Sequence, residues 1–106
     1  MNVLMNGTAI PEPLTLTSEW VTVAGVLLRQ VVLSYEFSNA PNAALVLGPG
    51  CAPAGVNLTF LDPMSNANVT LALLVYSASI SAALDRSGVV YYAPLVITLR
   101  QVPPGP

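Results

Sequence analysis

The chain has 106 residues, of which 54% are hydrophobic and only 8% are charged. Its cations are Arg29, Arg86 and Arg100, it has no histidine, and its net charge is −2. A chain of this length forms one domain, and three scattered arginines cannot supply the basic face that binding to phosphate backbones needs. We therefore expect no nucleic-acid partner.

The first segment, residues 1–13, is predicted to be an extended N-terminal arm. It contains Val3, Leu4 and Ile10 without strand alternation, and its two prolines favour extended backbone. Such an arm can lie across a neighbouring subunit. The segment lacks a positively charged region followed by a sustained apolar run, so we expect no signal peptide.

Two apolar runs follow, LTLTSEWVTVAG at 14–25 and VLLRQVVLSYEFS at 26–38. They meet at Ala24-Gly25, where a tight turn and a bulge are equally consistent with the sequence. In the second run Leu27, Val31 and Leu33 fall on one face, which is typical of a half-buried strand. The pair predicts two antiparallel strands.

The middle of the chain is predicted to contain two shorter strands. The run AALVL at 43–47 ends at GPGCAPAG, 48–55, which we interpret as a connecting loop because it is rich in glycine and proline. The run GVNLTFL at 55–61 places Val56, Leu58 and Phe60 on one side. The following turn contains Asp62, whose side chain we expect to bond to nearby backbone amides.

Residues 69–84, VTLALLVYSASISAAL, carry no charge. A membrane span needs about 20 apolar residues, and the serines interrupt the run before that length. The alternation of Ser77, Ser79 and Ser81 with apolar residues indicates a strand and not a helix. DRSG at 85–88 then predicts the turn of a long hairpin, and Pro94 predicts an edge, bulge or break in its second arm.

Both faces of the strand VTLALLVY are apolar, so both need cover. Val69 and Leu71 belong to one face, and Leu74 and Tyr76 belong to the other. With six predicted strands and no predicted helix, we expect an all-β protein, an antiparallel β-sandwich or jelly-roll-like fold. Its predicted parts are an N-terminal arm at 1–13, a β-sandwich domain at 14–102 and an extended C-terminal tail at 103–106.

Catalytic chemistry has few side chains to use in this sequence. Without histidine there is no imidazole base and no histidine metal site. Glu19 and Glu36 can in principle meet across the first hairpin, but two solvated carboxylates are the better interpretation. Cys51, the only cysteine, is expected to be a small buried or loop thiol. We expect no enzyme, no cofactor and no metal.

A surface so poor in charge predicts that much of it is covered by other subunits. The leading hypothesis is a structural, self-assembling protein and virion component, such as a capsid-decorating, cement or minor coat protein of a virus or phage. It would form a homo-oligomer, such as a trimer, contact other capsid or particle proteins and reside in the virion or another extracellular particle. The candidate interface residues are Val3, Leu4, Ile10, Leu71, Leu74, Tyr76, Tyr91 and Tyr92.

Two alternatives stay open. A pilus-type or cell-surface β-sandwich subunit would polymerise by donated strands and grow without closure. A small ligand- or carbohydrate-binding module would use Trp20 and the tyrosines as a stacking platform and stay monomeric, although strand aromatics more often serve a core or an interface.

Overall fold

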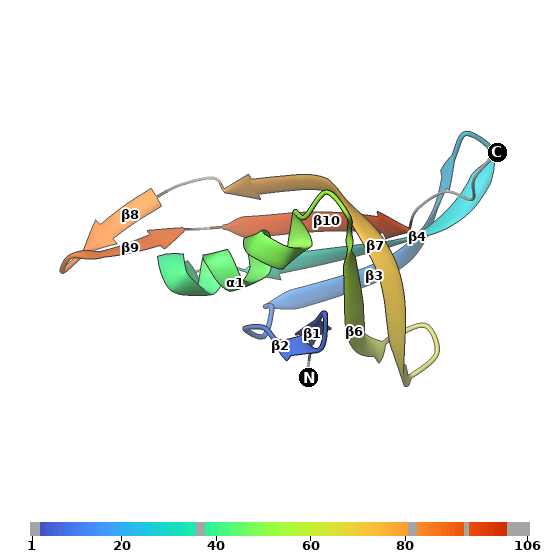
Figure 1. Cartoon of the computed structure of the whole chain (residues 1–106), viewed down its shortest axis with the longest axis horizontal. Coiled ribbons are helices and arrows are strands. Elements are labelled where there is room, and N and C mark those ends of the chain that lie inside the picture. Colours follow the sequence, from blue (N-terminus) through green and yellow to red (C-terminus); the bar gives the residue numbers. More distant parts are fainter. Residues whose placement is uncertain (1–2, 36–37, 81–82, 93, 102–106) are drawn as a thin grey trace.

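The computed structural model describes residues 3–35, 38–80, 83–92 and 94–101. Seven strands form one antiparallel sheet in the order β2-β1-β6-β7-β10-β4-β3. Their bounds are β1 Leu4–Met5, β2 Thr8–Ala9, β3 Thr15–Val23, β4 Val26–Tyr35, β6 Val56–Asp62, β7 Ala67–Ile80 and β10 Leu95–Gln101. A second sheet of three strands comprises β5 Ser38–Asn39, β9 Val89–Tyr92 and β8 Ala83–Arg86, and the helix α1 spans Ala40–Gly50 (Figure 1).

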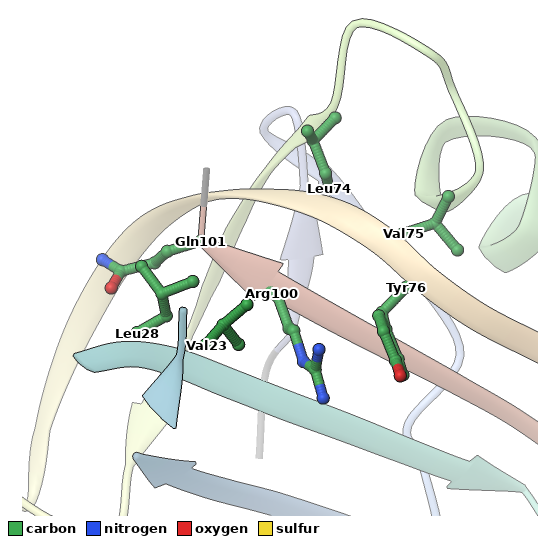
Figure 2. A pocket seen from close by; sticks show the side chains of 7 residues that line it. All are labelled: Val23, Leu28, Leu74, Val75, Tyr76, Arg100 and Gln101. Carbon is green, nitrogen blue, oxygen red and sulfur yellow. The ribbon is translucent and has the colours of Figure 1, made fainter. Parts of the chain in front are cut away.

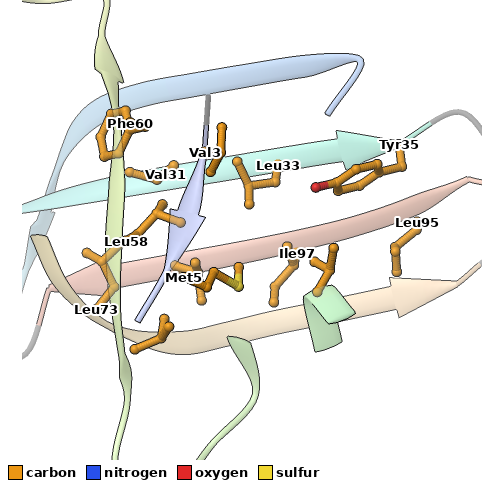
Figure 3. Packing of buried hydrophobic residues seen from close by; sticks show 13 residues of the cluster. Val3, Met5, Val31, Leu33, Tyr35, Leu58, Phe60, Leu73, Leu95 and Ile97 are labelled. Carbon is orange, nitrogen blue, oxygen red and sulfur yellow. The ribbon is translucent and has the colours of Figure 1, made fainter. Parts of the chain in front are cut away.

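The predicted all-β, antiparallel class is confirmed, but the two-sheet sandwich is not. The large sheet folds over on itself along β7, the longest strand. Leu73 pairs with Val56 of β6 on one side and with Gln101 of β10 on the other. The earlier half of β7 therefore pairs with β6, and the later half pairs with β10. In Figure 3 the ribbons of β1 and β6 run across those of β4 and β10.

The core lies inside this fold of the sheet (Figure 3). Alternate residues of each strand point into it, as the period of a pleated strand requires. The prediction that Val56, Leu58 and Phe60 share one buried side is confirmed. The other buried members of the cluster are Val3, Met5, Val31, Leu33, Tyr35, Val46, Leu73, Leu95, Ile97 and Leu99.

The junction of β3 and β4 is a two-residue turn. Val23 pairs with Val26, and both turn residues have positive φ, 51° at Ala24 and 81° at Gly25. Positive φ at both positions defines a type I′ turn, whose twist matches that of the flanking strands. Of the two conformations expected at Ala24-Gly25, the structure has the tight turn.

A β-bulge at Tyr76 explains the pattern of β7. Thr98 pairs with Ser77, but the next residue, Leu99, pairs with Val75, so Tyr76 is the extra residue. One extra residue exchanges the two faces of a strand. Odd-numbered residues before the bulge, such as Leu73, therefore point inward, and odd-numbered serines after it point outward.

The predicted strand at 43–47 is wrong, because α1 covers it and the first residues of the expected loop. The three alanines and two leucines of this segment have high helix propensity. Pro41 falls in the first turn, where a helix does not use the backbone N–H. Val46 is fully buried against the core, and Gly50 lies so close to β10 that a Cβ there would be 2.8 Å from Cδ1 of Ile97.

Residues 4–9 form a small hairpin on their own chain instead of an unpaired arm. Asn6 and Gly7 make its turn with φ of 52° and 80°, a dipeptide typical of type I′ turns. Leu4 and Met5 of β1 pair with Thr59 and Leu58 of β6. The hairpin therefore closes one side of the core.

The DRSG hairpin is confirmed, with Arg86 paired with Val89 and Ser87-Gly88 in the turn at φ of 53° and 79°. It extends β7 and β10 away from the core at one end of the molecule, which measures 50 × 27 × 20 Å (Figure 1). The second arm starts anew at Leu95 as β10, directly after Pro94, which fits the break expected there.

Candidate functional site

The face of the large sheet turned away from the core, here called the outer face, carries an open apolar groove of about 260 Å³. Strands β3, β4, β7 and β10 contribute side chains to it (Figure 2). The residues that line it are Val23, Leu28, Leu74, Val75, Tyr76, Arg100 and Gln101.

Strand register brings the groove together. Leu74 lies opposite Arg100 across the β7–β10 pair, and the bulge adds Tyr76 beside them. Leu28 is only 4% exposed although it does not belong to the core cluster. Its burial therefore comes from neighbours on the outer face. Tyr76 is 62% exposed and forms the open side of the groove.

Arg100 provides the only charge among the described residues that line the groove. Its Nε donates a hydrogen bond of 2.6 Å to Oε1 of Gln30, and its guanidinium carbon lies 3.5 Å from the centroid of the Tyr76 ring. This is a cation–π contact, which holds the ring and the guanidinium together. Within the described part of the chain Arg100 makes no ion pair, and it adds one positive charge to the apolar lining of the groove.

The structure brings together two of the predicted interface residues, Leu74 and Tyr76, on the outer face. It places three others in or against the core of their own chain: Val3 is 2% exposed, and Leu71 and Ile10 pack against the core cluster. In this conformation Val3 offers no surface to a partner.

The remaining predicted interface residues lie elsewhere. Leu4 is half-buried in β1. The side chains of Tyr91 and Tyr92 lie outside the described part of the structure, although their backbone forms part of β9.

The inner face holds an ion pair that the sequence analysis missed. Nη2 of Arg29 lies 2.9 Å from Oδ2 of Asp62 and also donates to the hydroxyl of Ser18, and the backbone N–H of Arg29 donates to Oε1 of Gln101. Arg29 and Asp62 are 9% and 2% exposed. Arg29 falls between Leu27 and Val31 in the alternation of β4, and this position was the available signal that its side chain points inward.

Asp62 accepts a hydrogen bond from the N–H of Met64, which confirms the expected contact with a nearby amide. Burial alone raises the pKa of Asp62. The hydrogen bonds from Met64, Arg29 and Ser18 and the positive charge of Arg29 outweigh burial and hold that pKa below its ordinary value. The carboxylate is therefore charged at neutral pH. On the same face the guanidinium carbon of Arg29 lies 5.2 Å from the centroid of the Trp20 ring.

The described part of the structure does not show Glu19 and Glu36, the two glutamates considered as a catalytic pair, close together. Glu19 lies opposite Gln30 and accepts a hydrogen bond of 2.6 Å from its Nε2, and Glu36 lies outside the described residues. The described residues contain no group of three or more metal-ligating side chains. None of the helices among them is long and apolar enough to cross a membrane.

Comparisons with protein-family models, with curated proteins and with solved structures find no match for this chain.

Proposed function

We propose that this chain is a structural protein that assembles with copies of itself, as a component of a virus or phage particle. The observation that carries the proposal is the outer-face groove, where Leu74 and Tyr76 leave apolar surface uncovered beside Arg100. The sparse charge of the whole chain supports it, because the share of charged residues in soluble domains is usually about three times as large.

The proposed contact is between the groove of one subunit and a different surface of the next. Two identical grooves facing each other would bring two Arg100 guanidinium groups together, and like charges in a desolvated contact are unfavourable. A head-to-tail contact avoids this repulsion and closes into a ring when the rotation between subunits allows it. A trimer is the smallest such ring. Within a particle, other coat proteins would complete the cover.

The exposed apolar side chains elsewhere on the chain support a head-to-tail contact. Leu14, Leu61 and Met64 are 65%, 40% and 54% exposed, and none of them lines the groove. A subunit therefore carries apolar surface of its own to offer to the groove of a neighbour.

The experiment is the substitution Leu74→Lys, compared with Ser79→Lys on the same strand. Both positions lie on the outer face of β7, but only Leu74 lines the groove. We expect Leu74→Lys to abolish the groove contact, measured by light scattering as a fall in native mass, and to leave a folded chain because a lysine stem can lie along apolar surface. Ser79→Lys is expected to assemble as the natural chain does.

Equal assembly of the two variants would refute the role of the groove. If Leu74→Lys does not fold, Tyr76→Ser provides the same comparison at a side chain that is already 62% exposed.

A second candidate function, a carbohydrate-binding module, rests on a different observation. Trp20 and Leu27 are 51% and 61% exposed and line an open cavity of about 460 Å³. One exposed indole offers a flat apolar surface of the kind on which a sugar ring stacks. Trp20 is the only tryptophan, so a change in its fluorescence on titration with sugars would report binding directly.

A further inference from the structure

In the part of the chain that the structure describes, β3 forms an open edge of the large sheet. An edge strand presents unpaired backbone N–H and C=O groups to other strands. Among the described strands β2 and β5 are edges of two residues each, and the edge strand β8 has four residues that include Asp85 and Arg86. β3 is nine residues long.

The β3 edge also lacks the features by which proteins usually protect an edge. Its sequence, TLTSEWVTV, contains no proline and no lysine, and its pairing with β4 runs without a register shift from Thr15 to Val23. Five of its nine residues are β-branched, a residue type that favours strands. Its one charged residue, Glu19, is bound to Gln30 of β4, which draws the carboxylate toward the sheet and away from the open side.

The type I′ turn decides which backbone groups face outward. Such a turn joins Val23 and Val26 by a hydrogen bond, so the backbone groups of Val23 point at β4. Because the direction alternates along a strand, the N–H groups of Ser18, Trp20 and Thr22 point to the open side.

The inner-face side chains beside this edge are uncovered as well. Trp20 lies opposite Arg29, and Thr22 lies opposite Leu27, so the Trp20–Leu27 cavity borders the open edge. A strand added to β3 would place its own side chains next to the indole of Trp20.

We propose that the occupant of this edge is the β3 strand of a second copy, paired antiparallel about a two-fold axis at Trp20. In this register Trp20 faces Trp20, Ser18 faces Thr22, and Glu19 faces Val21. The alternative register centred on Glu19 would place two carboxylates opposite each other, which is unfavourable, whereas aromatic pairs and pairs of hydroxyl side chains across strands are favourable. The two large sheets then become one continuous sheet.

A second copy fits this edge better than a charged foreign strand does. The edge is nearly neutral and so is its own copy, and an antiparallel pair of identical strands is self-complementary by symmetry. The inference extends the proposed self-assembly to a second surface and rests on it. Among the described residues the two surfaces share Val23, whose side chain lines the groove and whose backbone groups point at β4.

The experiment is amide hydrogen exchange of the full chain, measured by NMR in a dilute and a concentrated sample whose native masses are known. In the concentrated sample we expect the amides of Ser18, Trp20 and Thr22 to exchange at least about tenfold more slowly than in the dilute one. The amides of Glu19 and Val21, which face β4, should be protected equally in both samples.

The variants Thr22→Pro and Thr22→Ala provide a matched pair, because both remove the threonine side chain and only proline removes the outward N–H. We expect the dissociation constant of the edge contact to be at least about tenfold higher in Thr22→Pro than in Thr22→Ala. If Thr22→Pro fails to fold, the exchange measurement decides alone.

Three results would overturn the inference: unchanged exchange of the three outward amides in a sample that is oligomeric, equal association of the two Thr22 variants when both are folded, or a monomer at both concentrations. The variant Leu74→Lys separates the two surfaces. If Leu74→Lys loses association and the natural chain shows no protection of the β3 amides, the proposed groove contact is supported and the edge contact is refuted. Edge protection that persists in Leu74→Lys supports the edge contact, and it counts against the groove only if the native mass of this variant also equals that of Ser79→Lys.

Discussion

Tyr35 ties the N-terminal segment to the core through one buried hydroxyl. The side chain is 4% exposed, and its hydroxyl donates a hydrogen bond of 2.6 Å to the backbone carbonyl of Pro11. Burial raises the pKa of Tyr35 from 10.0 to about 12, because the phenolate is poorly solvated inside the protein.

This raised pKa predicts a loss of stability in alkali. The folded chain keeps the proton to higher pH than the unfolded chain, so the contribution is complete below about pH 10 and is lost as the pH rises to about 12. Two pKa units correspond to roughly 2 to 3 kcal/mol of unfolding free energy. Urea unfolding at pH 8 and pH 11.5 would measure it.

Tyr35→Phe serves as the control. It should be less stable than the natural chain at pH 8 by about 1 kcal/mol, the usual net value of one hydrogen bond, and its stability should decline less between the two pH values. An equal alkaline decline in both proteins would contradict the assignment.

The Arg29–Asp62 pair shows how a charged residue enters this small core. Asp62→Leu leaves the buried guanidinium without its carboxylate, and we expect a loss of about 3 to 5 kcal/mol in the free energy of unfolding. The double variant Arg29→Leu with Asp62→Leu should recover much of that loss, because it removes both charges. A double-mutant cycle by urea denaturation measures the coupling, and additive losses would show that the pair is not coupled.

The stability of the chain at acid pH provides a second test of the Arg29–Asp62 pair. The folded-state pKa of Asp62 is depressed, so its stabilising contribution is present above the ordinary aspartate pKa of 3.8 and is lost as the pH falls through the lower folded value. The natural chain should therefore lose stability below about pH 4 more steeply than Asp62→Leu does.

At the level of elements, the bulge at Tyr76 keeps both halves of β7 in phase with the core. Removing Tyr76 restores plain alternation, since Val75, Ala78 and Ile80 then fall at inward positions without a bulge. We expect this deletion to cost about 1 kcal/mol through the lost contact with Arg100.

Deletion of Ala72 is the matched comparison. It leaves the bulge in place and shifts one half of β7 by a residue, which turns side chains such as Leu71 away from the core. That variant should lose several kcal/mol or fail to fold. Thermal unfolding followed by circular dichroism compares the two deletions, and equal losses would contradict the role assigned to the bulge.

The strands were predictable where a period of two runs between clear turn signals, as in β4 and β6. The helix was not, because its glycine and proline at 48–50 resemble a loop and the burial of Val46 against the core decides the outcome. The β1–β2 hairpin carried a signal in Asn6-Gly7, but its strands of two residues are too short to show alternation. The only local sign of the bulge in the sequence is that odd-numbered positions of β7 are apolar before Tyr76 and are serines after it.

The candidate site was predictable only in part, for a related reason. Leu74 and Tyr76 stood out because both faces of their strand are apolar, and the structure leaves the outer one open. Their neighbours Leu28 and Arg100 come from other strands and meet them through strand register, which a single sequence does not specify. Val3 and Leu71 are equally apolar but lie inward, so apolarity alone could not separate interface from core.

At the level of the whole molecule, one folded sheet provides the core with its inner face and the proposed subunit contacts with its outer face. Folding along β7 buries the inner faces of its strands against one another, and no other described element forms a layer over the outer face. In most antiparallel sheets that outer face is polar, whereas here it carries the groove around Leu74 and Tyr76. We propose that copies of the chain provide a layer over this face.

The most direct measurement is the native mass of the purified chain over a wide concentration range, by light scattering after size exclusion. The account predicts an oligomer of defined mass, several times the 11.0 kDa of one chain, at the upper end of that range. A monomer at every concentration would contradict it.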